Sequence, residues 1–274
     1  MRKIILYIFL TTLALIFILP IIIIGYNAFK DQTSILRDPF SLPNKDSYVG
    51  FLNFKTGWNS AGFGRAIFYS FFITTISVLL ICILSAMCAW YLARVKKKFT
   101  KVIYYVFVFS MLIPFQMVMF SLTQIASMLY MNNPLGIILI YIAYGSALSV
   151  FTYFGFIRGI PVEIEEAALI DGCNPIQCFF RVIMPTLAPI SITIAILNAM
   201  WIWNDYLLPY LILGSGQYKT IPVAIQLALT GLYGSINWGA FMAMLVFAII
   251  PIIIFYLFGQ KYIIKGVLDG SIKG

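Results

Sequence analysis

Long blocks of hydrophobic residues, separated by shorter polar segments, run along the whole chain. Apolar stretches of about 18 residues or more are long enough to cross a lipid bilayer as helices. The run from Leu6 to Ile24 does not alternate apolar and polar positions, as a strand of a membrane barrel would. The pattern therefore predicts an all-α fold, a six-transmembrane-helix bundle in a single domain over 1–274. The expected spans are about 4–25, 66–93, 102–130, 134–157, 185–213 and 238–258.

The amino-acid composition also indicates a membrane protein. Hydrophobic residues make up 62% of the chain and charged residues only 10%, whereas about a quarter of a soluble domain is charged. The first block is longer than the apolar core of a secretory signal, and no small-residue cleavage site follows it before Tyr26. We therefore expect an uncleaved first span in a multi-pass membrane protein.

Positive charge gathers in the segments that follow every second span, as it does in cytoplasmic loops. With both termini cytoplasmic, twelve of the 18 basic residues lie on the inner side. They are Arg2, Lys3, Arg94, Lys96, Lys97, Lys98, Lys101, Arg158, Arg181, Lys261, Lys265 and Lys273. The net charge of +9 thus reflects topology, and no basic face with interleaved aromatic residues indicates a nucleic-acid partner.

Several kinds of chemistry are excluded by residue type. The chain has no histidine, so a histidine-based catalytic triad or metal site is excluded. Cys82, Cys88, Cys173 and Cys178 form no C-x-x-C pair, and we expect inert thiols without a metal. The chain also lacks the phosphate-binding loop G-x-x-x-x-G-K-[ST], so it cannot bind ATP by that route.

The loop 158–184, between the fourth and fifth spans, has the signals of two short helices. Pro161 suits a first helical turn, and Gly172 suits the end of that helix. Pro175 then starts a second helix. Small and apolar residues on the first helix would fit a groove in a partner, and an ordinary surface connector is the equal alternative. The outer segment 26–65, which mixes both signs of charge, is interpreted as a solvated cap whose aromatic residues could also cover the bundle or touch a partner.

Polar residues inside the spans are candidates for a solute path. Asp205 is the only acidic residue in any expected span, and buried charges in membranes face the bundle interior or a wet cavity. Asn198, Trp201, Asp205 and Leu208 recur at helical spacing and should share one face. Structural hydrogen bonding between helices is the alternative. The candidate path residues are Gln116, Gln124, Asn198, Trp201, Asn204 and Asp205, and Pro114, Pro189 and Pro209 mark sites where a span can bend.

The loop 158–184 carries a pattern that resembles the EAA motif of ABC importer permeases. That motif reads EAA, three residues, G, nine residues, then I-x-L-P; here Glu166-Ala167-Ala168 is followed by Gly172 and by Val182-Ile183-Met184-Pro185 at the same spacing. The segments AWYLARVKKKF, MLIPFQMV, WIWNDYLLPYLIL and KYIIKGVLDGSIKG extend the resemblance to maltose-type carbohydrate permeases over nearly the whole chain.

The resemblance implies a permease subunit of an ATP-driven importer that moves a carbohydrate, an oligosaccharide in particular, across the bacterial plasma membrane by alternating access. The implied partners are a second homologous permease, a dimer of ATPase subunits that hold ATP and Mg, and an extracytoplasmic solute-binding protein. The chain itself would be no enzyme and would bind no cofactor. The implied coupling residues are Glu166, Ala167, Ala168, Asp171, Gly172 and Pro185.

Three alternatives stay open on sequence alone. A secondary transporter would need internal repeats and several buried ionisable groups, which are not evident. A membrane-embedded enzyme would need convergent nucleophiles, acids or metal ligands. An ABC permease for a polyol or a glycerophosphate would carry the same motif as one for a sugar.

Overall fold

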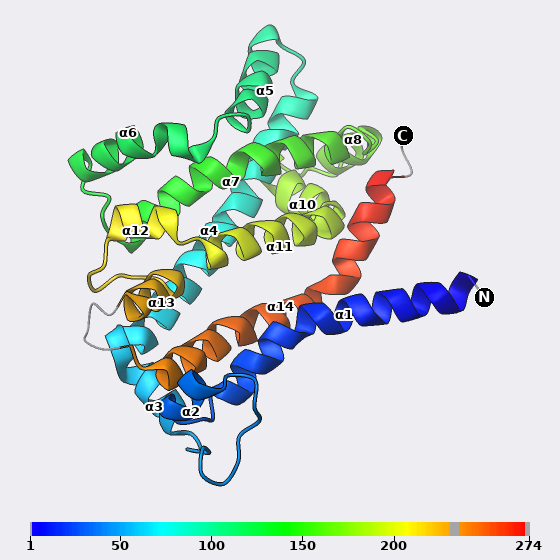
Figure 1. Ribbon diagram of the computed structural model, residues 1–274. Helices are drawn as coiled ribbons and strands as arrows, with labels where there is room; N and C mark the ends of the chain where they lie inside the picture. Colours follow the sequence, from blue (N-terminus) through cyan, green and yellow to red (C-terminus); the bar gives the residue numbers. More distant parts are fainter. Residues whose placement is uncertain (1, 231–235, 272–274) are drawn as a thin grey trace. The chain divides into compact units, whose positions relative to one another are not determined.

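The protein is built from helices connected by short loops (Figure 1). A computed structural model describes residues 2–230 and 236–271. Met1, residues 231–235 and residues 272–274 lie outside this described part. The residue contacts separate two compact units within the single domain expected from the sequence. One unit comprises Met1–Phe68 with Ser215–Ile253, and the other comprises Tyr69–Gly214 with Ile254–Gly274.

Four helices are long and apolar enough to cross a membrane by themselves. Their apolar runs extend over at least 20 residues each, which matches the thickness of the hydrocarbon core. The expected spans 4–25, 66–93, 134–157 and 238–258 are therefore confirmed as helices. They are α1 (Arg2–Asn27), α4 (Phe63–Arg94), α7 (Pro134–Ile157) and α14 (Trp238–Ser271).

The remaining two expected spans are not straight helices. The span 102–130 consists of α5 (Lys98–Ser110) and α6 (Phe115–Met128), which meet at 106°. Pro114 explains the break, because a proline disfavours helical backbone in the residue before it and its own extended conformation starts α6. The bend that the sequence allows at Pro114 is therefore present, and the two helices together can form the third span.

The fifth span is broken twice. A short helical segment ends at Thr186 and, beyond Leu187, meets α11 (Ala188–Asn204) at 79°. Pro189 in the first turn of α11 cannot donate a backbone hydrogen bond to the preceding segment. A second break at Asp205 and Tyr206 separates α11 from α12 (Leu207–Leu213), so 185–213 is not one continuous helix either. With each bent pair counted as one span, the described residues provide up to six spans.

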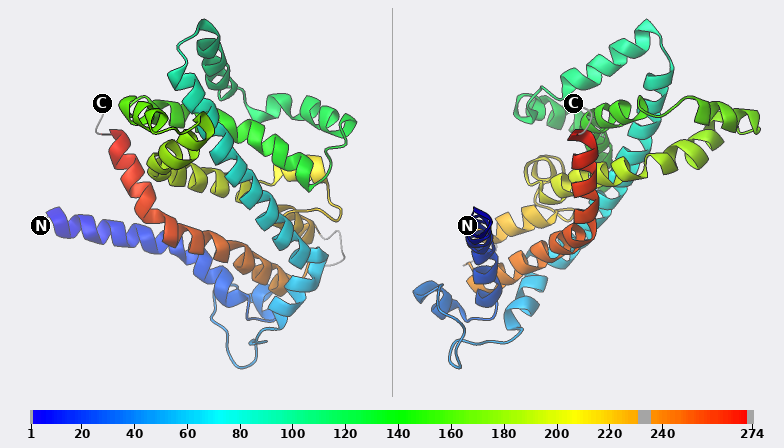
Figure 2. Two further views of the ribbon diagram at one scale, coloured as in Figure 1. Left: turned by 180° about the vertical axis from the view of Figure 1, so that it is seen from behind. Right: turned by 90° about the vertical axis from the view of Figure 1, so that its right-hand side faces the viewer.

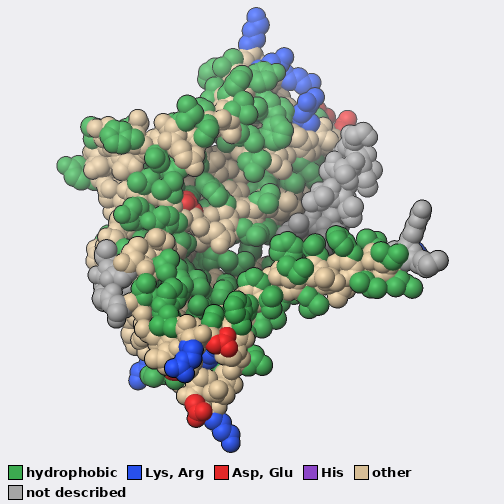
Figure 3. Space-filling model, viewed as in Figure 1, with side chains coloured by type: hydrophobic (Ala, Val, Ile, Leu, Met, Phe, Trp, Pro, Cys, Tyr) green, Lys and Arg blue, Asp and Glu red, His purple; other side chains and the backbone are tan. Residues whose placement is uncertain are grey.

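The surface of α1 is apolar all round. Figure 3 shows hydrophobic side chains along this helix, and most of its residues from Ile4 to Ile22 are exposed within the chain. Exposed apolar side chains on a helix of this length are what lipid tails solvate. The composition and the exposure of α1 together fit a helix in contact with lipid.

The outer segment between α1 and α4 is folded more tightly than a solvated loop. It contains α2 (Gln32–Arg37), α3 (Leu52–Asn59) and the short 3-10 helix η1 (Ser60–Gly62). Lys30 is 0% exposed, and its Nζ donates to the carbonyls of Asp38 at 2.7 Å and Ser41 at 3.0 Å. The interpretation of 26–65 as simply solvated is therefore wrong for Lys30, because backbone carbonyls replace the water that its ammonium group would otherwise bind.

Aromatic residues pack this segment against α14, as one interpretation of the sequence anticipated. Phe54 contacts Phe29 with ring centroids 5.0 Å apart, and Phe54 and Trp58 both contact Phe247 of α14. At the start of α2, hydrogen bonds from Ser34 and Thr33 lower the pKa of Asp31 to about 2. The carboxylate therefore stays charged at neutral pH. It caps the N-terminus of α2 by accepting hydrogen bonds from the backbone N–H groups of Thr33 and Ser34.

In the other unit, α4, α7 and α11 come together at a glycine. Figures 1 and 2 show α7 and α11 side by side. A Cβ on Gly145 of α7 would lie 2.5 Å from Ile81 Cδ1 of α4 and 2.7 Å from Asn198 Oδ1 of α11. Glycine permits this approach without displacing the ends of the Ile81 and Asn198 side chains, and small residues serve the same purpose in other membrane helix interfaces.

We expect the substitution Gly145→Ala to lower the stability of the purified protein by about 1 kcal/mol relative to Gly155→Ala, because the ends of the Ile81 and Asn198 side chains must shift to admit the added methyl group. Gly155→Ala is the matched control, since Gly155 lies on the same helix and a Cβ there meets nothing within 4 Å. The measurement is the thermal unfolding midpoint of both variants in detergent. An equal midpoint for the two variants would contradict the close approach at Gly145.

Candidate functional site

The first helix of the loop 158–184 is α8 (Glu163–Ile170), and a glycine ends it. Gly172 has a φ of +85°, a conformation that glycine adopts without strain. The Cys173 N–H donates to the Ala168 carbonyl at 3.0 Å and the Gly172 N–H donates to the Leu169 carbonyl at 3.1 Å. This pair of bonds is the Schellman motif, and it confirms the helix end that the sequence predicts at Gly172.

The second helix, α9 (Pro175–Cys178), also begins where the sequence predicts. The Asn174 carboxamide accepts from the Gln177 N–H at 2.9 Å, while Gln177 Oε1 accepts from the Asn174 N–H at 3.0 Å. This reciprocal capping box fixes the start of the helix. The chain continues through a π-helical turn, η2 (Phe179–Ile183), into α10 (Met184–Thr186), where the Thr186 hydroxyl donates to the Val182 carbonyl.

The predicted coupling residues divide between the two sides of this loop. Glu166, Ala167, Asp171 and Gly172 are exposed on α8 and at its end, and Pro185 is exposed at α10. Ala168 is buried instead, in a core that includes Ile157, Ile160 and Phe179. Apolar side chains also stand in solvent here, since Ile170 is 85% exposed and Ile176 is 65% exposed. We name the exposed residues Glu166, Ala167, Ile170, Asp171, Gly172 and Ile176 the coupling surface.

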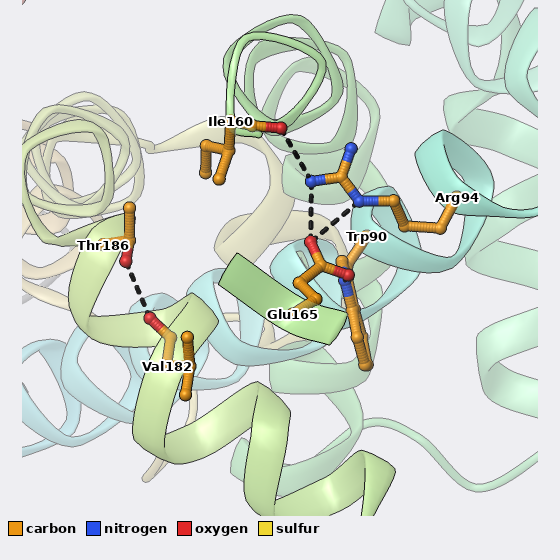
Figure 4. A network of polar contacts seen from close by, with 6 residues as sticks. All are labelled: Trp90, Arg94, Ile160, Glu165, Val182 and Thr186. Carbon is orange, nitrogen blue, oxygen red and sulfur yellow. Dashed lines mark hydrogen bonds and ion pairs between the residues drawn. The ribbon is translucent and has the colours of Figure 1, made fainter. Parts of the chain in front are cut away.

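A buried ionic contact fixes the opposite side of α8 (Figure 4). Glu165 is 6% exposed, and its carboxylate accepts from Arg94 Nε at 2.8 Å and from Trp90 Nε1 at 2.9 Å. Arg94 Nη2 lies 2.6 Å from the same carboxylate and donates to the Ile160 carbonyl at 3.1 Å. Glu165 was not among the residues predicted from the sequence. The available signal was a second glutamate beside Glu166, together with the AWYLAR segment that ends α4.

The thiols of the loop have no evident chemistry. Burial raises the pKa of the Cys178 thiol, which makes it a poorer nucleophile at neutral pH. Among the described residues no group of His, Cys, Asp and Glu side chains could hold a metal ion.

The acidic residue of the fifth span lies in the break between α11 and α12. Asp205 accepts hydrogen bonds from the Tyr141 hydroxyl at 3.0 Å and from the Leu207 N–H at 3.0 Å. Its carboxylate therefore caps α12 and joins that break to α7. The expectation that Asn198, Trp201, Asp205 and Leu208 share one helical face was wrong, because helical periodicity ends at Asn204.

A cavity of about 550 Å³ opens beside α7 and α11. Asn198 and Trp201 line it, whereas Gln116, Gln124, Asn204 and Asp205 do not. Phe115 and Tyr144 add aromatic faces to Trp201, and Ser110 adds a hydroxyl group. The Asn198 carboxamide donates to the Ser149 hydroxyl at 3.2 Å and to the Ile194 carbonyl at 2.9 Å. The structure thus brings two of the six candidate path residues into one cavity.

The chain is similar to known proteins both in sequence and in fold. Residues 81–269 match the family model described as "Binding-protein-dependent transport system inner membrane component". The chain is 37% identical over 261 residues to the probable starch degradation products transport system permease protein AmyC of Thermoanaerobacterium thermosulfurigenes, covering 95% of this chain and 93% of the relative. It is 31% identical to the multiple sugar-binding transport system permease protein MsmG of Streptococcus mutans, covering 97% and 96%.

Among solved structures, the fold is similar to a chain of a bacterial ABC transporter involved in the import of the acidic polysaccharide alginate. The TM-score is 0.79 at 24% sequence identity, with 95% of this chain and 96% of that chain covered. At this identity the likeness concerns the fold.

Proposed function

This chain belongs to the family of inner membrane components of binding-protein-dependent transport systems, and from that premise we propose that it carries an oligosaccharide through the membrane. As a permease subunit it is a transporter component and not an enzyme. The observation that supports an ATP-driven importer is the coupling surface. There, small and apolar residues are exposed on a helix whose other side is buried in the core.

The coupling surface would receive an ATPase subunit. Ala167 leaves room for a partner to approach closely, and the apolar side chains of Ile170 and Ile176 would be buried on contact. Glu166 and Asp171 add negative charge that a basic residue of the partner could pair with. ATP and Mg would be bound by the partner ATPase dimer, and its closure would move α8.

The cavity beside α7 and α11 supports a carbohydrate as the solute. Aromatic faces offer apolar contact to the C–H groups of a sugar ring, and Ser110 and Asn198 offer hydrogen bonds to its hydroxyl groups. Names of relatives point to the same class, since one is a melibiose/raffinose/stachyose import permease of Bacillus subtilis, 34% identical over 230 residues. Gln116, Gln124 and Asn204 are exposed away from this cavity, and their place on the path stays a prediction.

The arrangement in the membrane follows from the charges. We place both termini and the loop 158–184 in the cytoplasm of a bacterial cell, so that the outer segment 26–65 faces an extracytoplasmic solute-binding protein. A second homologous permease would complete the pathway. Exposed apolar residues on α6, including Met117 and Phe120, provide a face for that subunit or for lipid.

Family membership favours the importer over a secondary transporter or a membrane enzyme, and neither alternative has support in the fold. The decisive experiment is gentle-detergent purification of the tagged chain followed by reconstitution in liposomes. We expect a second permease and an ATPase at fixed stoichiometry. With the solute-binding protein added, we expect ATP hydrolysis stimulated by one sugar in a panel of melibiose, raffinose, stachyose and maltotriose. Uptake of solute by the chain alone, without an ATPase, would refute the proposal.

A further inference from the structure

The inner side of α8 is fastened to one particular helix. Glu165 and Ala168 are three residues apart, so both lie on the side of α8 opposite the coupling surface, and both are buried. The side-chain groups that donate to the Glu165 carboxylate, Trp90 and Arg94, belong to the last turns of α4. Among the described residues, the hydrogen bonds of the Glu165 side chain therefore connect α8 to the end of α4.

The geometry of this attachment makes it stiff. Arg94 approaches one carboxylate oxygen through two nitrogen atoms while Trp90 donates to the other oxygen, so both oxygens of Glu165 are held. A guanidinium group is planar and fixes the angle of its partner as well as the distance. A buried pair of this kind resists separation, because each charge would be left without a partner away from water.

Apolar contacts reinforce the same connection. The ring of Trp90 packs on that of Phe179, with centroids 5.7 Å apart, and Phe179 is part of the core that holds Ala168. Ala89 and Leu92 of α4 belong to this core too. A displacement of α8 would therefore carry the end of α4 with it.

From its end, α4 leads to the wall of the cavity. This helix runs without a break over 32 residues, and its Ile81 lies against Gly145, which lines the cavity. Towards α11 the chain itself offers a less direct connection, because the segment from α8 passes a π-helical turn and the 79° bend at Leu187. Towards α7 the chain connection is the non-helical segment 158–162, so the Glu165 contact gives α8 a second attachment, to α4. A straight helix transmits a push along its axis better than a segment that can bend.

We propose that Glu165, Arg94 and Trp90 form a mechanical link that passes the movement of α8 to α4, and through Ile81 to the cavity wall. The proposal rests on the proposed function and adds positioning residues to it. The link acts through contacts inside this chain, so it is separate from the surface that binds the ATPase.

The test uses the complete complex, reconstituted in liposomes, with the sugar that most stimulates the wild-type ATPase as the probe. In Glu165→Gln and in Arg94→Gln the coupling surface is unchanged, so the ATPase should co-purify as in wild type. We expect sugar transported per ATP hydrolysed to fall about tenfold in each variant, a typical size for a lost coupling. The double variant should be no worse than either single one, because both break the same link.

Two further variants separate transmission from general stability. Trp90→Phe keeps the ring on Phe179 and removes one donor, so it should lose less coupling than Arg94→Gln. Asn53→Ala removes a buried side chain that donates to the Ala28 and Lys30 carbonyls in the other unit. It should lower the unfolding temperature and leave transport per ATP unchanged.

Three results would overturn the link: unchanged transport per ATP in both single variants, additive losses in the double variant, or loss of the ATPase from the variant complexes. The last result would mean that the pair only shapes the docking surface. Failure of the wild-type chain to bind any ATPase would instead count against the proposed function itself, and it would be seen before any variant is made.

Discussion

Replacing Gly172 with valine should uncouple ATP hydrolysis from transport in the assembled importer. Gly172 ends α8 with a φ of +85°, and an L-residue in this left-handed region costs about 1–2 kcal/mol, more when it is β-branched. The Schellman bonds at Cys173 and Gly172 would be distorted, and α8 would end differently beneath the ATPase. We expect transport per ATP to fall about tenfold or more, measured with labelled sugar in liposomes.

Two variants control for strain. Gly172→Asn introduces a side chain that tolerates left-handed backbone, and a Cβ at this position meets nothing within 4 Å, so much of the coupling should survive. Gly214 has a φ of +68° at the end of α12 and equally open surroundings. Gly214→Val should lower stability without changing transport per ATP. Equal effects of valine at both glycines would show that strain, and not the position in the coupling loop, governs the loss.

The substitution Ala167→Trp should strongly weaken the binding of the ATPase. Ala167 is exposed on α8, so a large side chain there should leave the fold of the permease intact while blocking close approach of a partner. Truncating or blocking a central interface residue commonly costs 2 kcal/mol or more, about a thirtyfold loss of affinity. We expect the variant to purify with an unchanged unfolding temperature and with little or no ATPase, as judged by stoichiometry on a gel.

Asn59→Trp is the matched control for Ala167→Trp. Asn59 is an exposed helical residue at the end of α3 in the outer segment, where no ATPase is expected. This variant should retain the ATPase in full. Normal ATPase binding by Ala167→Trp would show that α8 is not the docking helix and would remove the basis of the coupling surface.

The helices long enough to cross the membrane could be predicted from the sequence. In lipid, only helices and closed barrels satisfy the backbone hydrogen bonds. Runs of about twenty apolar residues predicted α1, α4 and α7 within a few residues, and they predicted the start of α14, which continues beyond the expected end at 258 to Ser271. Gly172 and Pro175 predicted the end of α8 and the start of α9, whereas Pro161 lies before the first residue of α8, Glu163. The resemblance on Glu166-Ala167-Ala168 and Gly172 predicted a permease of the binding-protein-dependent type, which the family match confirms.

Only the tertiary structure decided how the polar residues are used. Helical spacing placed Asp205 on a face with Asn198, yet the helix breaks there and Asp205 caps α12. Segment 26–65 looked solvated, yet Lys30 is buried among carbonyls contributed by residues up to eleven positions away. Nothing in the sequence next to Glu165 indicates its partner, which is Arg94, 71 residues earlier in the chain.

The difference has a physical reason. Whether a segment lies in lipid depends on the hydropathy of that segment, and a helix end depends on the conformation of one or two residues. Both can therefore be predicted from residues that are neighbours in the sequence. The partner of a buried charge is decided by which distant segments pack together, because such a charge must find its hydrogen bonds wherever the fold supplies them. Local sequence therefore determined the spans and the loop helices, while the link from α8 to α4 and the composition of the cavity were determined by packing alone.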